Sequence, residues 1–555
     1  MKRLSILLLA GAALLAGCTK ELVESPVVGE DGYVITASAT APGAFIDSKV
    51  NYTDAWDERE GMGDITAGAW AAGDSFTALE INGDVITPVT FTTTGTGASA
   101  EFKSSGAVAA DENTTWVAVS GKATVENGTL ICSYDGQDGS LGKLGNYDYA
   151  VGQSTGESPV FDFASGKRLT YVMRLKVPDL TKYVEFNTGI DRNGGWNVSS
   201  AGKATGTTSC TEKEAVKMIT LSSDAGGFVY LAVPAIDLMH SSENRLAGII
   251  VTIMTADKRH SQGKAISTNL AARGGHTALY DMSSLEWMAR PLASEAIRLG
   301  SITYGSDSYP LGSWAPFNVG GDVPTSDEAI KGGQYSWAET ESKTSFTKNN
   351  YRWLDGSAYS TQRGYKYVGV AEGVKPFIEV SYAGGKGHQH GPGTYYDIAG
   401  TKYDAARVKW GSEWKMPSSE ICNNLLKGGD YSLTEEIDVD EKLKYTEYEA
   451  GTYTNDQGYK STTMGCIVYE ANGAKLALYR CSYTDNGSTN SSGTEGRYWM
   501  SCTDYGTRFY TDNPESESGN YWNRACQMRL IDGENYINNK SWVWDGLRIR
   551  AVLNE

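Results

Sequence analysis

The sequence has few prolines, few histidines and little positive charge for its length. It contains 14 Pro and 5 His among 555 residues, and 67 Asp+Glu outnumber 49 Lys+Arg to give a net charge of −18. The low proline content and the 40% of hydrophobic residues exclude a collagen-like repeat and wholesale disorder. A chain this acidic lacks the basic face that phosphate contacts need, so we expect no nucleic-acid partner. The length corresponds to roughly three to four domains.

Motifs of catalysis are also absent. The sequence contains no Gly-x-Ser-x-Gly elbow, no Walker-type glycine loop and no Cys-x-x-Cys. Its most closely spaced histidines, His388 and His390, lie in a Gly-rich loop and form a candidate metal clip. No partner ligand follows from their spacing, so a solvated loop is the favoured interpretation. We therefore predict that the protein is not an enzyme and carries no catalytic cofactor.

Cysteine occurs too irregularly for a complete disulfide framework. Seven cysteines follow Cys18, and an odd number leaves at least one thiol unpaired. Most of them lie in apolar, strand-like settings, which favours buried free thiols. The candidate disulfide is Cys502–Cys526.

A long apolar run occurs at the N-terminus. Lys2 and Arg3 precede the run 4–15, and Ala16-Gly17-Cys18 follows, which predicts a secretory signal over residues 1–17. A cysteine directly after Ala-Gly resembles a bacterial lipobox, in which the thiol is acylated and becomes the first residue; the alternative is an ordinary signal with a chance cysteine. Loss of the signal removes two positive charges from −18 and leaves −20. We expect a surface-exposed lipoprotein anchored in the outer membrane through Cys18, with residues 18–31 as a tether.

A composition shift near residue 300 separates two halves of the chain. Residues 1–299 hold 9 Tyr and 5 Trp, whereas residues 300–555 hold 24 Tyr and 9 Trp. In the first half, Tyr171 to Val177 alternates in the manner of a half-buried strand. Further strands are predicted over 85–93, 116–119, 129–132, 228–233 and 249–254. Because helical periodicity is scarce, we predict two β-sandwiches, at 32–160 and 161–290, with a soft boundary around 155–165.

The order of features in the first half resembles the fimbrillin-like family of bacterial surface lipoproteins, whose sandwiches are transthyretin-like. The resemblance rests on a strand at 33–38, a Trp-x-x-Gly-Asp at 70–74 and a closing strand at 275–280. It implies trimming by a protease, for which Lys49 and Arg59 are the candidate positions, although the family usually has Arg where this chain has Lys49. It also implies that other fimbrial subunits bind by strand exchange, in which an open sheet edge accepts another chain's strand.

The C-terminal half reads as an α+β domain whose core depends on aromatic residues. Asp404 to Trp410 has the composition of a short helix that stops at Gly411. Ser418 is a plausible N-cap for a second helix, with Ile421 and Leu425 on one face. The remainder consists of short strands and long polar loops. Most tryptophans of this half are expected in the core.

Five segments of residues 300–555 resemble a FISUMP-type domain of C-type-lectin-like fold. They are Trp-Ala-x-x-Asn-Val-Gly at 314–320, Tyr-x-Trp-Ala-Glu-Thr at 335–340, Trp-x-Met-Pro-Ser-x-Glu at 414–420, Tyr-Trp-x-Ser at 498–501 and Arg-x-Arg-x-Val at 548–552. The matching residues look structural, and the fold by itself names no ligand.

Lectins of this fold bind calcium through a carboxylate/amide-Pro-carboxylate/amide loop and a later Trp-Asn-Asp. Asp512, Asn513 and Glu515, with Asn523 further on, resemble fragments of that pattern and are candidate calcium ligands. Arg524 stands where the second Asp would be, so a plain surface loop is the favoured alternative.

Two functions fit these observations. The first is a fimbrial subunit or adhesin, placed at a tip, that presents its C-terminal domain to a host or glycan ligand. The second is a stand-alone glycan-binding lipoprotein for polysaccharide capture, in which exposed Tyr and Trp form stacking platforms.

Overall fold

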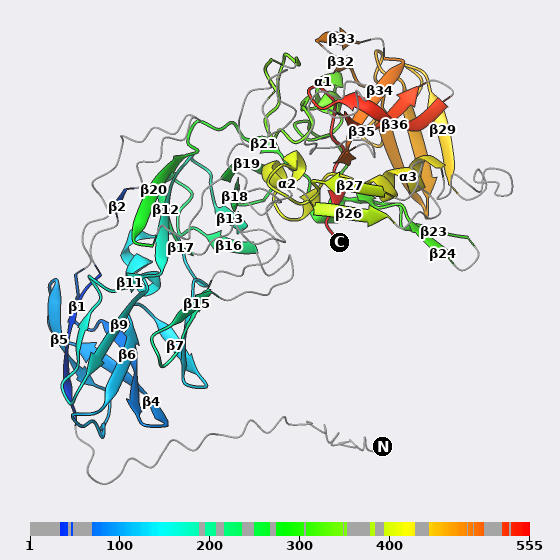
Figure 1. The fold of residues 1–555 in the computed structure, drawn as a ribbon. Helices are drawn as coiled ribbons and strands as arrows, with labels where there is room; N and C mark the ends of the chain where they lie inside the picture. The colour runs from blue at the N-terminus through cyan, green and yellow to red at the C-terminus, as the bar shows by residue number, and fades with distance from the viewer. Residues whose placement is uncertain are drawn as a thin grey trace, which may run out of the picture.

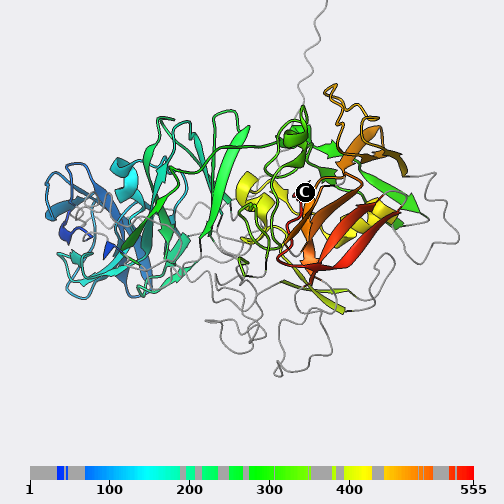
Figure 2. The same ribbon diagram turned by 90° about the horizontal axis from the view of Figure 1, so that it is seen from above.

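The computed structural model describes residues 34–42, 46–47, 69–187, 195–206, 216–235, 249–266, 274–304, 307–347, 349–351, 378–382, 393–427, 443–485, 487–491, 493–503, 524–531 and 534–555. The fold is mainly β, as predicted, and consists of several sheets with three short α-helices in this part of the chain. Three bodies follow one another along the chain (Figures 1 and 2). Among the described residues, no helix has the length and apolarity needed to cross a bilayer.

The first body is a single curled sheet of eight strands in the order β10-β1-β5-β4-β3-β6-β9-β11. The strands are β1 (Thr36–Thr40), β3 (Ser75–Asn82), β4 (Val85–Thr93), β5 (Ser99–Ser104), β6 (Thr115–Val119), β9 (Ala150–Thr155), β10 (Val160–Asp162) and β11 (Lys167–Arg168). Curling brings β10 back to β9, where the backbone N–H of Val160 donates to Ser154 Oγ at 2.8 Å. The sheet therefore wraps around its own core and runs past residue 160, to Arg168.

The second body is a sandwich of two sheets. One contains β17 (Gly227–Pro234), β12 (Thr170–Val177), β20 (His276–Asp281) and β2 (Ile46–Asp47), in that order. The other contains β16 (Val216–Thr220), β13 (Tyr183–Asn187), β18 (Ile249–Met254), β19 (His260–Ile266) and β21 (Met288–Ala289). The five strands predicted from composition coincide with β4, β6, β8 (Thr129–Ser133), β17 and β18 to within a residue at each end, so those predictions are confirmed.

Strand β12 differs from its prediction. Its inward residues Tyr171, Met173 and Leu175 are buried as expected, but Val172 and Arg174 on the opposite face are buried as well. The second face is covered because a further core joins the first body to the second. The prediction of a half-buried strand was wrong since alternation in the sequence does not reveal a neighbouring domain.

That joining core is flanked by a four-stranded sheet drawn from both bodies. Strands β7 (Ala123–Glu126) and β8 come from the first, and β14 (Gly195–Val198) and β15 (Ala204–Gly206) from the second. A short 3-10 helix, η1 (Leu141–Tyr147), contributes Leu144 to the same core. The first two bodies are thus continuous in both hydrogen bonding and apolar packing.

The third body begins after a second 3-10 helix, η2 (Ala293–Glu295). Its largest sheet contains β26 (Ile378–Tyr382), β27 (Gly393–Asp397), β34 (Glu495–Thr503), β35 (Arg524–Ile531) and β36 (Glu534–Trp542). A second sheet contains β22 (Ile297–Arg298), β25 (Ser313–Trp314), β37 (Val552–Leu553) and β28 (Trp414–Lys415). Smaller sheets are β23 (Ser301–Tyr304) with β24 (Asp307–Pro310), β29 (Lys444–Tyr448) with β30 (Cys466–Ala471) and β31 (Ala474–Tyr479), and β32 (Tyr483–Asp485) with β33 (Ser488–Asn490).

The helices of this body are α1 (Asp327–Lys331), α2 (Ala405–Trp410) and α3 (Ser419–Lys427). Both helices expected from the sequence are confirmed as α2 and α3. Asp404 caps α2 by accepting from the N–H of Arg407 at 3.1 Å, and Gly411, with φ +85°, ends the helix. Ser418 Oγ accepts from the N–H of Ile421 at 3.4 Å at the start of α3.

The core of the third body is built from aromatic residues, as predicted. Six of its seven described tryptophans are buried. The five segments singled out in the sequence meet in this interior: Trp337 donates to the carbonyl of Met500 at 3.1 Å, and Trp499 donates to the carbonyl of Tyr335 at 2.7 Å. Arg550 donates to Asn318 Oδ1 at 2.8 Å from a fully enclosed position. These residues therefore have structural roles.

Candidate functional site: the first strand

The first strand of the chain lies inside a sheet rather than at its edge. Strand β1 pairs in antiparallel fashion with β5 over five residues and in parallel with β10 over three. In this structure the strand is provided by the chain itself. Its removal would leave β5 and β10 facing an open groove.

The inward face of β1 is built from small side chains. Ile35, Ala37, Ala39 and Ala41 alternate into the core and are all at least 95% buried. They cover a cluster of aromatic rings in which Trp70 and Phe102 lie 5.0 Å apart, and Phe76 and Phe102 lie 4.8 Å apart; further rings come from Phe161 and Phe163. With three alanines among four inward positions, the strand contributes little apolar surface of its own.

Backbone hydrogen bonds therefore dominate the attachment of β1. Ser38 N–H donates to the carbonyl of Pro159 at 3.0 Å, and Ala41 N–H donates to that of Ala98 at 2.7 Å. Trp70 Nε1 donates to the carbonyl of Ala39 at 3.0 Å, which gives the Trp-x-x-Gly-Asp motif a role in holding the strand. A site held mainly by backbone hydrogen bonds, with small side chains at alternate inward positions, has the features that strand addition requires.

The chain leaves the first body directly after β1. Ile46 and Asp47, as β2, pair in parallel with His276 and Thr277 of β20 in the second body. Lys49 lies two residues beyond β2, outside the described residues. A cut after Lys49 would separate both strands from the rest of the chain.

Most other predicted site residues also lie outside the described residues. These are Cys18, Arg59, His388, His390, Asp512, Asn513, Glu515 and Asn523. Lipidation, trimming and calcium binding stay predictions. Within the described part of the chain, no group of three or more His, Cys, Asp or Glu is arranged to hold a metal ion.

The structure brings Cys502 and Cys526 to adjacent strands, β34 and β35, in one buried core cluster. Cys502 is a free thiol there, so the candidate disulfide is not formed in this structure. The sheet pairing of β34 and β35 is sufficient to bring the residues together. Cys132, Cys422, Cys466 and Cys481 are buried free thiols, which confirms that expectation for them.

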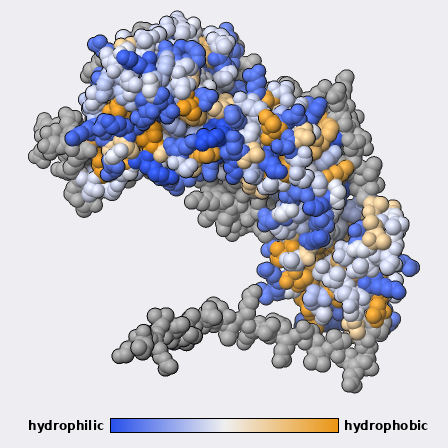
Figure 3. Space-filling model, turned by 180° about the vertical axis from the view of Figure 1, so that it is seen from behind, coloured by the Kyte–Doolittle hydropathy of each residue, from blue (hydrophilic) through white to orange (hydrophobic). Residues whose placement is uncertain are grey.

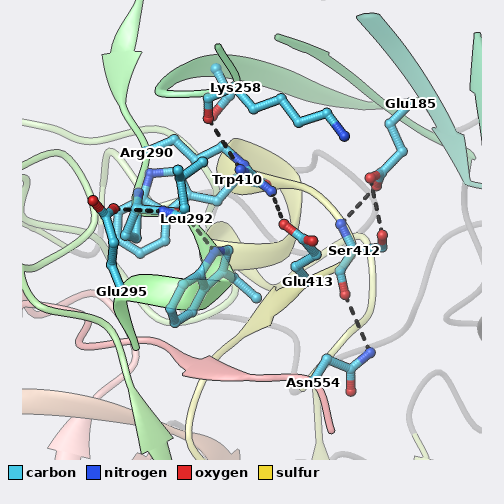
Figure 4. A network of polar contacts seen from close by, with 12 residues as sticks. Glu185, Lys258, Arg290, Leu292, Glu295, Trp410, Ser412, Glu413 and Asn554 are labelled. Carbon is cyan, nitrogen blue, oxygen red and sulfur yellow. Dashed lines mark hydrogen bonds and ion pairs between the residues drawn. The ribbon is translucent and has the colours of Figure 1, made fainter. Parts of the chain in front are cut away.

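A second site, which is polar and lies between the second and third bodies, was not predicted from the sequence. It centres on Glu185 and Arg290, which hold loop and helix atoms around Trp410 and Ser412 (Figure 4). One signal was available: Glu185 is the only charged residue of β13, between Val184 and Phe186. Arg290 carried no comparable signal because the strand that precedes it, β21, is only two residues long.

No family model and no curated protein matches the chain. Solved structures that are similar to it include a proposed cell adhesion protein from Bacteroides ovatus, 14% identical, covering 45% of this chain and 91% of that one, with a TM-score of 0.29. A fimbrial protein from the same organism is 10% identical and covers 94% of this chain and 99% of that one, with a TM-score of 0.21. A proposed adhesin from Bacteroides thetaiotaomicron is 10% identical and covers 43% and 90%, with a TM-score of 0.21. At TM-scores this low, the function has to follow from the chain's own residues.

Proposed function

We propose that the protein is a non-catalytic surface lipoprotein of the fimbrial, fimbrillin-like type, in which a partner subunit's strand replaces β1 and the C-terminal domain is presented as an adhesin. The observation that carries this proposal is the position of β1, which is internal to the sheet but held mainly through its backbone. An incoming strand with small residues at alternate positions would restore the same hydrogen bonds.

Trimming would connect assembly with release from the membrane. Acylated Cys18 would hold the precursor in the outer membrane, and a cut after Lys49 or Arg59 would separate the body of the protein from that anchor. The body would then be retained by the subunit whose strand fills the groove. One proteolytic event would thus control both steps.

A terminal position in the assembly is supported by the third body. It covers the outer face of the sheet that contains β13, where Ser412 N–H donates to Glu185 Oε1 at 2.7 Å. Strand β37 is bonded on both sides, by Trp314 of β25 and by Lys415 of β28, so that strand is not available to a neighbour. A subunit that accepts a strand but keeps its own C-terminal strand fits a tip better than a repeating stalk.

The mature N-terminus of the protein recovered from assembled surface fibres tests this proposal. Mass spectrometry should find it at Val50 or Glu60, the residues that follow the two candidate cut positions. Lys49→Gln with Arg59→Gln should leave the protein anchored and unassembled. An assembled protein that still begins at lipidated Cys18 would contradict the proposal.

A stand-alone glycan-binding lipoprotein is the second candidate, favoured by tyrosines on the third body. Tyr445 is 47% exposed, and the partly exposed rings of Tyr448 and Tyr453 lie 5.0 Å apart. Partly exposed tyrosines offer an apolar face and a polar tip to a sugar. A glycan array probed with the full chain, with and without chelator, tests this function and the calcium site: binding lost on Tyr445→Ala supports it, and uniform lack of binding rejects it.

A further inference from the structure

The end of helix α2 is satisfied by the second β-sandwich rather than by its own domain. The last carbonyls of a helix have no partner within the helix. Here Thr252 Oγ1 donates to the carbonyl of Val408 at 3.0 Å, and Ser261 Oγ donates to that of Lys409 at 2.7 Å. These donors come from β18 and β19, so the helix is completed by strands that lie far before it in the sequence.

Arg290 extends the same pattern to the next carbonyl. Its Nε donates to the carbonyl of Trp410 at 2.6 Å, its Nη1 donates to that of Lys258 at 3.1 Å, and its Nη2 pairs with Glu413. The guanidinium is almost fully enclosed, with 2% of its side chain exposed (Figure 4). Three consecutive carbonyls of α2 are therefore each matched to a donor from outside the third body.

The third body in turn donates hydrogen bonds to acceptors that precede it in the chain. Trp410 Nε1 donates to the carbonyl of Ala289 at 2.9 Å, and Trp414 Nε1 donates to that of Pro291 at 3.1 Å. Ser412 donates to both oxygens of Glu185, through its N–H at 2.7 Å and its Oγ at 3.0 Å. The contact is thus a reciprocal set of directional bonds.

Glycine permits the close approach at the centre of the contact. A Cβ atom added at Gly263, in β19, would lie 1.9 Å from the carbonyl oxygen of Val408. Glycine in the interior of a strand weakens the strand itself, and it is found where another backbone comes close. The nearest atom to this Cβ belongs to the docked helix, so the contact with α2 accounts for glycine at this position of β19.

We propose that the second β-sandwich and the C-terminal domain form one rigid, cooperatively unfolding unit, coupled through the end of α2. The coupling fixes the angle of the C-terminal domain relative to the sandwich. It also means that opening of α2 and opening of β18 and β19 occur in one event. This inference is independent of strand exchange and of any ligand.

Hydrogen–deuterium exchange of the full chain over a denaturant series tests the coupling. Peptides covering β18–β19 and α2 should open at the same denaturant midpoint in the wild type, with opening equilibria equal within about twofold. Different midpoints for the two sets of peptides in the wild type would overturn the proposal.

Variants separate coupling from simple stability. Gly263→Val should split the common unfolding transition into two. The equilibrium constant for opening of α2 should then exceed that of β18 at least tenfold. Gly106→Val is the matched control, since no atom lies within 4 Å of the added Cβ there, and it should leave one transition. If Gly263→Val fails to fold, Thr252→Val with Ser261→Ala removes two donors at little change in volume and should produce the same split. A single unsplit transition in a folded variant of either kind would also overturn the proposal.

Discussion

The two junctions of this chain hold neighbouring bodies together by different chemistry. Between the first and second bodies, the contact is mainly an apolar core shared by Leu130, Val172 and Tyr230. Between the second and third, it is a set of hydrogen bonds and buried charges around Glu185 and Arg290. The first junction stabilises by burial, which is not directional; the second stabilises by matching individual donors to individual acceptors.

Hydrogen bonds also occur at the first junction, but there they extend the backbone pairing of the sheets from one body to the next. Gln137 donates through Nε2 to the carbonyl of Ala232 at 2.8 Å and accepts from its N–H at 2.8 Å, so its amide pairs with the free edge of β17 as a strand residue would. Strand β8 pairs with β14 across the same boundary. The first two bodies therefore extend each other, whereas the third is docked.

Exposed large apolar residues are also distributed unevenly between the first two bodies and the third. Of the nine exposed large apolar residues in the described part of the chain, seven lie in the first two bodies and only Val323 and Tyr445 in the third. On the face drawn in Figure 3, orange apolar areas are interspersed with polar surface. Isolated apolar residues of this kind are normal at a protein surface.

The largest effect is expected from opening the apolar junction. Leu130→Ala should lower the free energy of unfolding by roughly 2–5 kcal/mol, because a fully buried side chain in the shared core is replaced by a cavity. Chemical denaturation measures the change. Leu130→Met is the matched control and should cost less than about 1.5 kcal/mol; equal losses for both variants would show that this position is not packed as described.

Loss of the arginine at the polar junction should have the next largest effect. Arg290→Ala leaves the carbonyls of Trp410 and Lys258 without their donor, at a cost of roughly 2–3 kcal/mol. Hydrogen exchange should place this loss in the second and third bodies and leave β3 and β4 protected as before. Arg290→Lys keeps the charge but not the fork of donors and should recover only part of the loss. Uniform loss of protection over all three bodies would contradict the separation of the junctions.

A smaller, pH-dependent effect is expected at Glu185. Burial raises the pKa of this carboxyl, and the neighbouring Arg407 and the Ser412 donors offset part of that rise. Because the pKa is raised on folding, the folded state binds the proton more tightly, so this group's contribution is present below the unfolded pKa and is lost as pH rises through the folded pKa. Glu185→Gln should therefore flatten the decline of stability that sets in as pH rises above the unfolded pKa, about 4.3, and through the raised pKa of the folded state. A profile unchanged by the substitution would contradict the buried position of the carboxylate.

The smallest effect is expected at the surface of the third body. Arg298 pairs with Glu555 at 2.6 Å, but the two side chains are 57% and 58% exposed. Arg298→Ala should change the free energy of unfolding by less than about 0.5 kcal/mol, and added salt should remove even that difference. A loss comparable to that of Arg290→Ala would mean that exposed pairs also hold the junction.

The sequence was informative wherever the pattern was local. Runs such as 249–254 and the helix with its Asp404 cap were found because apolar periodicity, capping and glycine stops act within a few residues. The buried outer face of β12 and the donors to α2 could not be found, since each depends on a partner far away along the chain; Thr252 and Val408 are 156 residues apart. The position of β1 between β5 and β10 could not be found for the same reason: the resemblance implied a strand at 33–38, but the neighbours of a strand are set by the topology of the sheet.

Exchange of β1 is the most direct test of the proposed function. The full chain, with a specific protease site introduced at Lys49, is cut after folding and mixed with a labelled peptide of residues 33–42. Fluorescence polarisation should show that the cut chain takes up this peptide, while the uncut chain does not and a peptide carrying Ala37→Asp and Ala39→Asp binds neither. Equal uptake by cut and uncut chains, or none by the cut chain, would contradict the account of β1 as a replaceable strand.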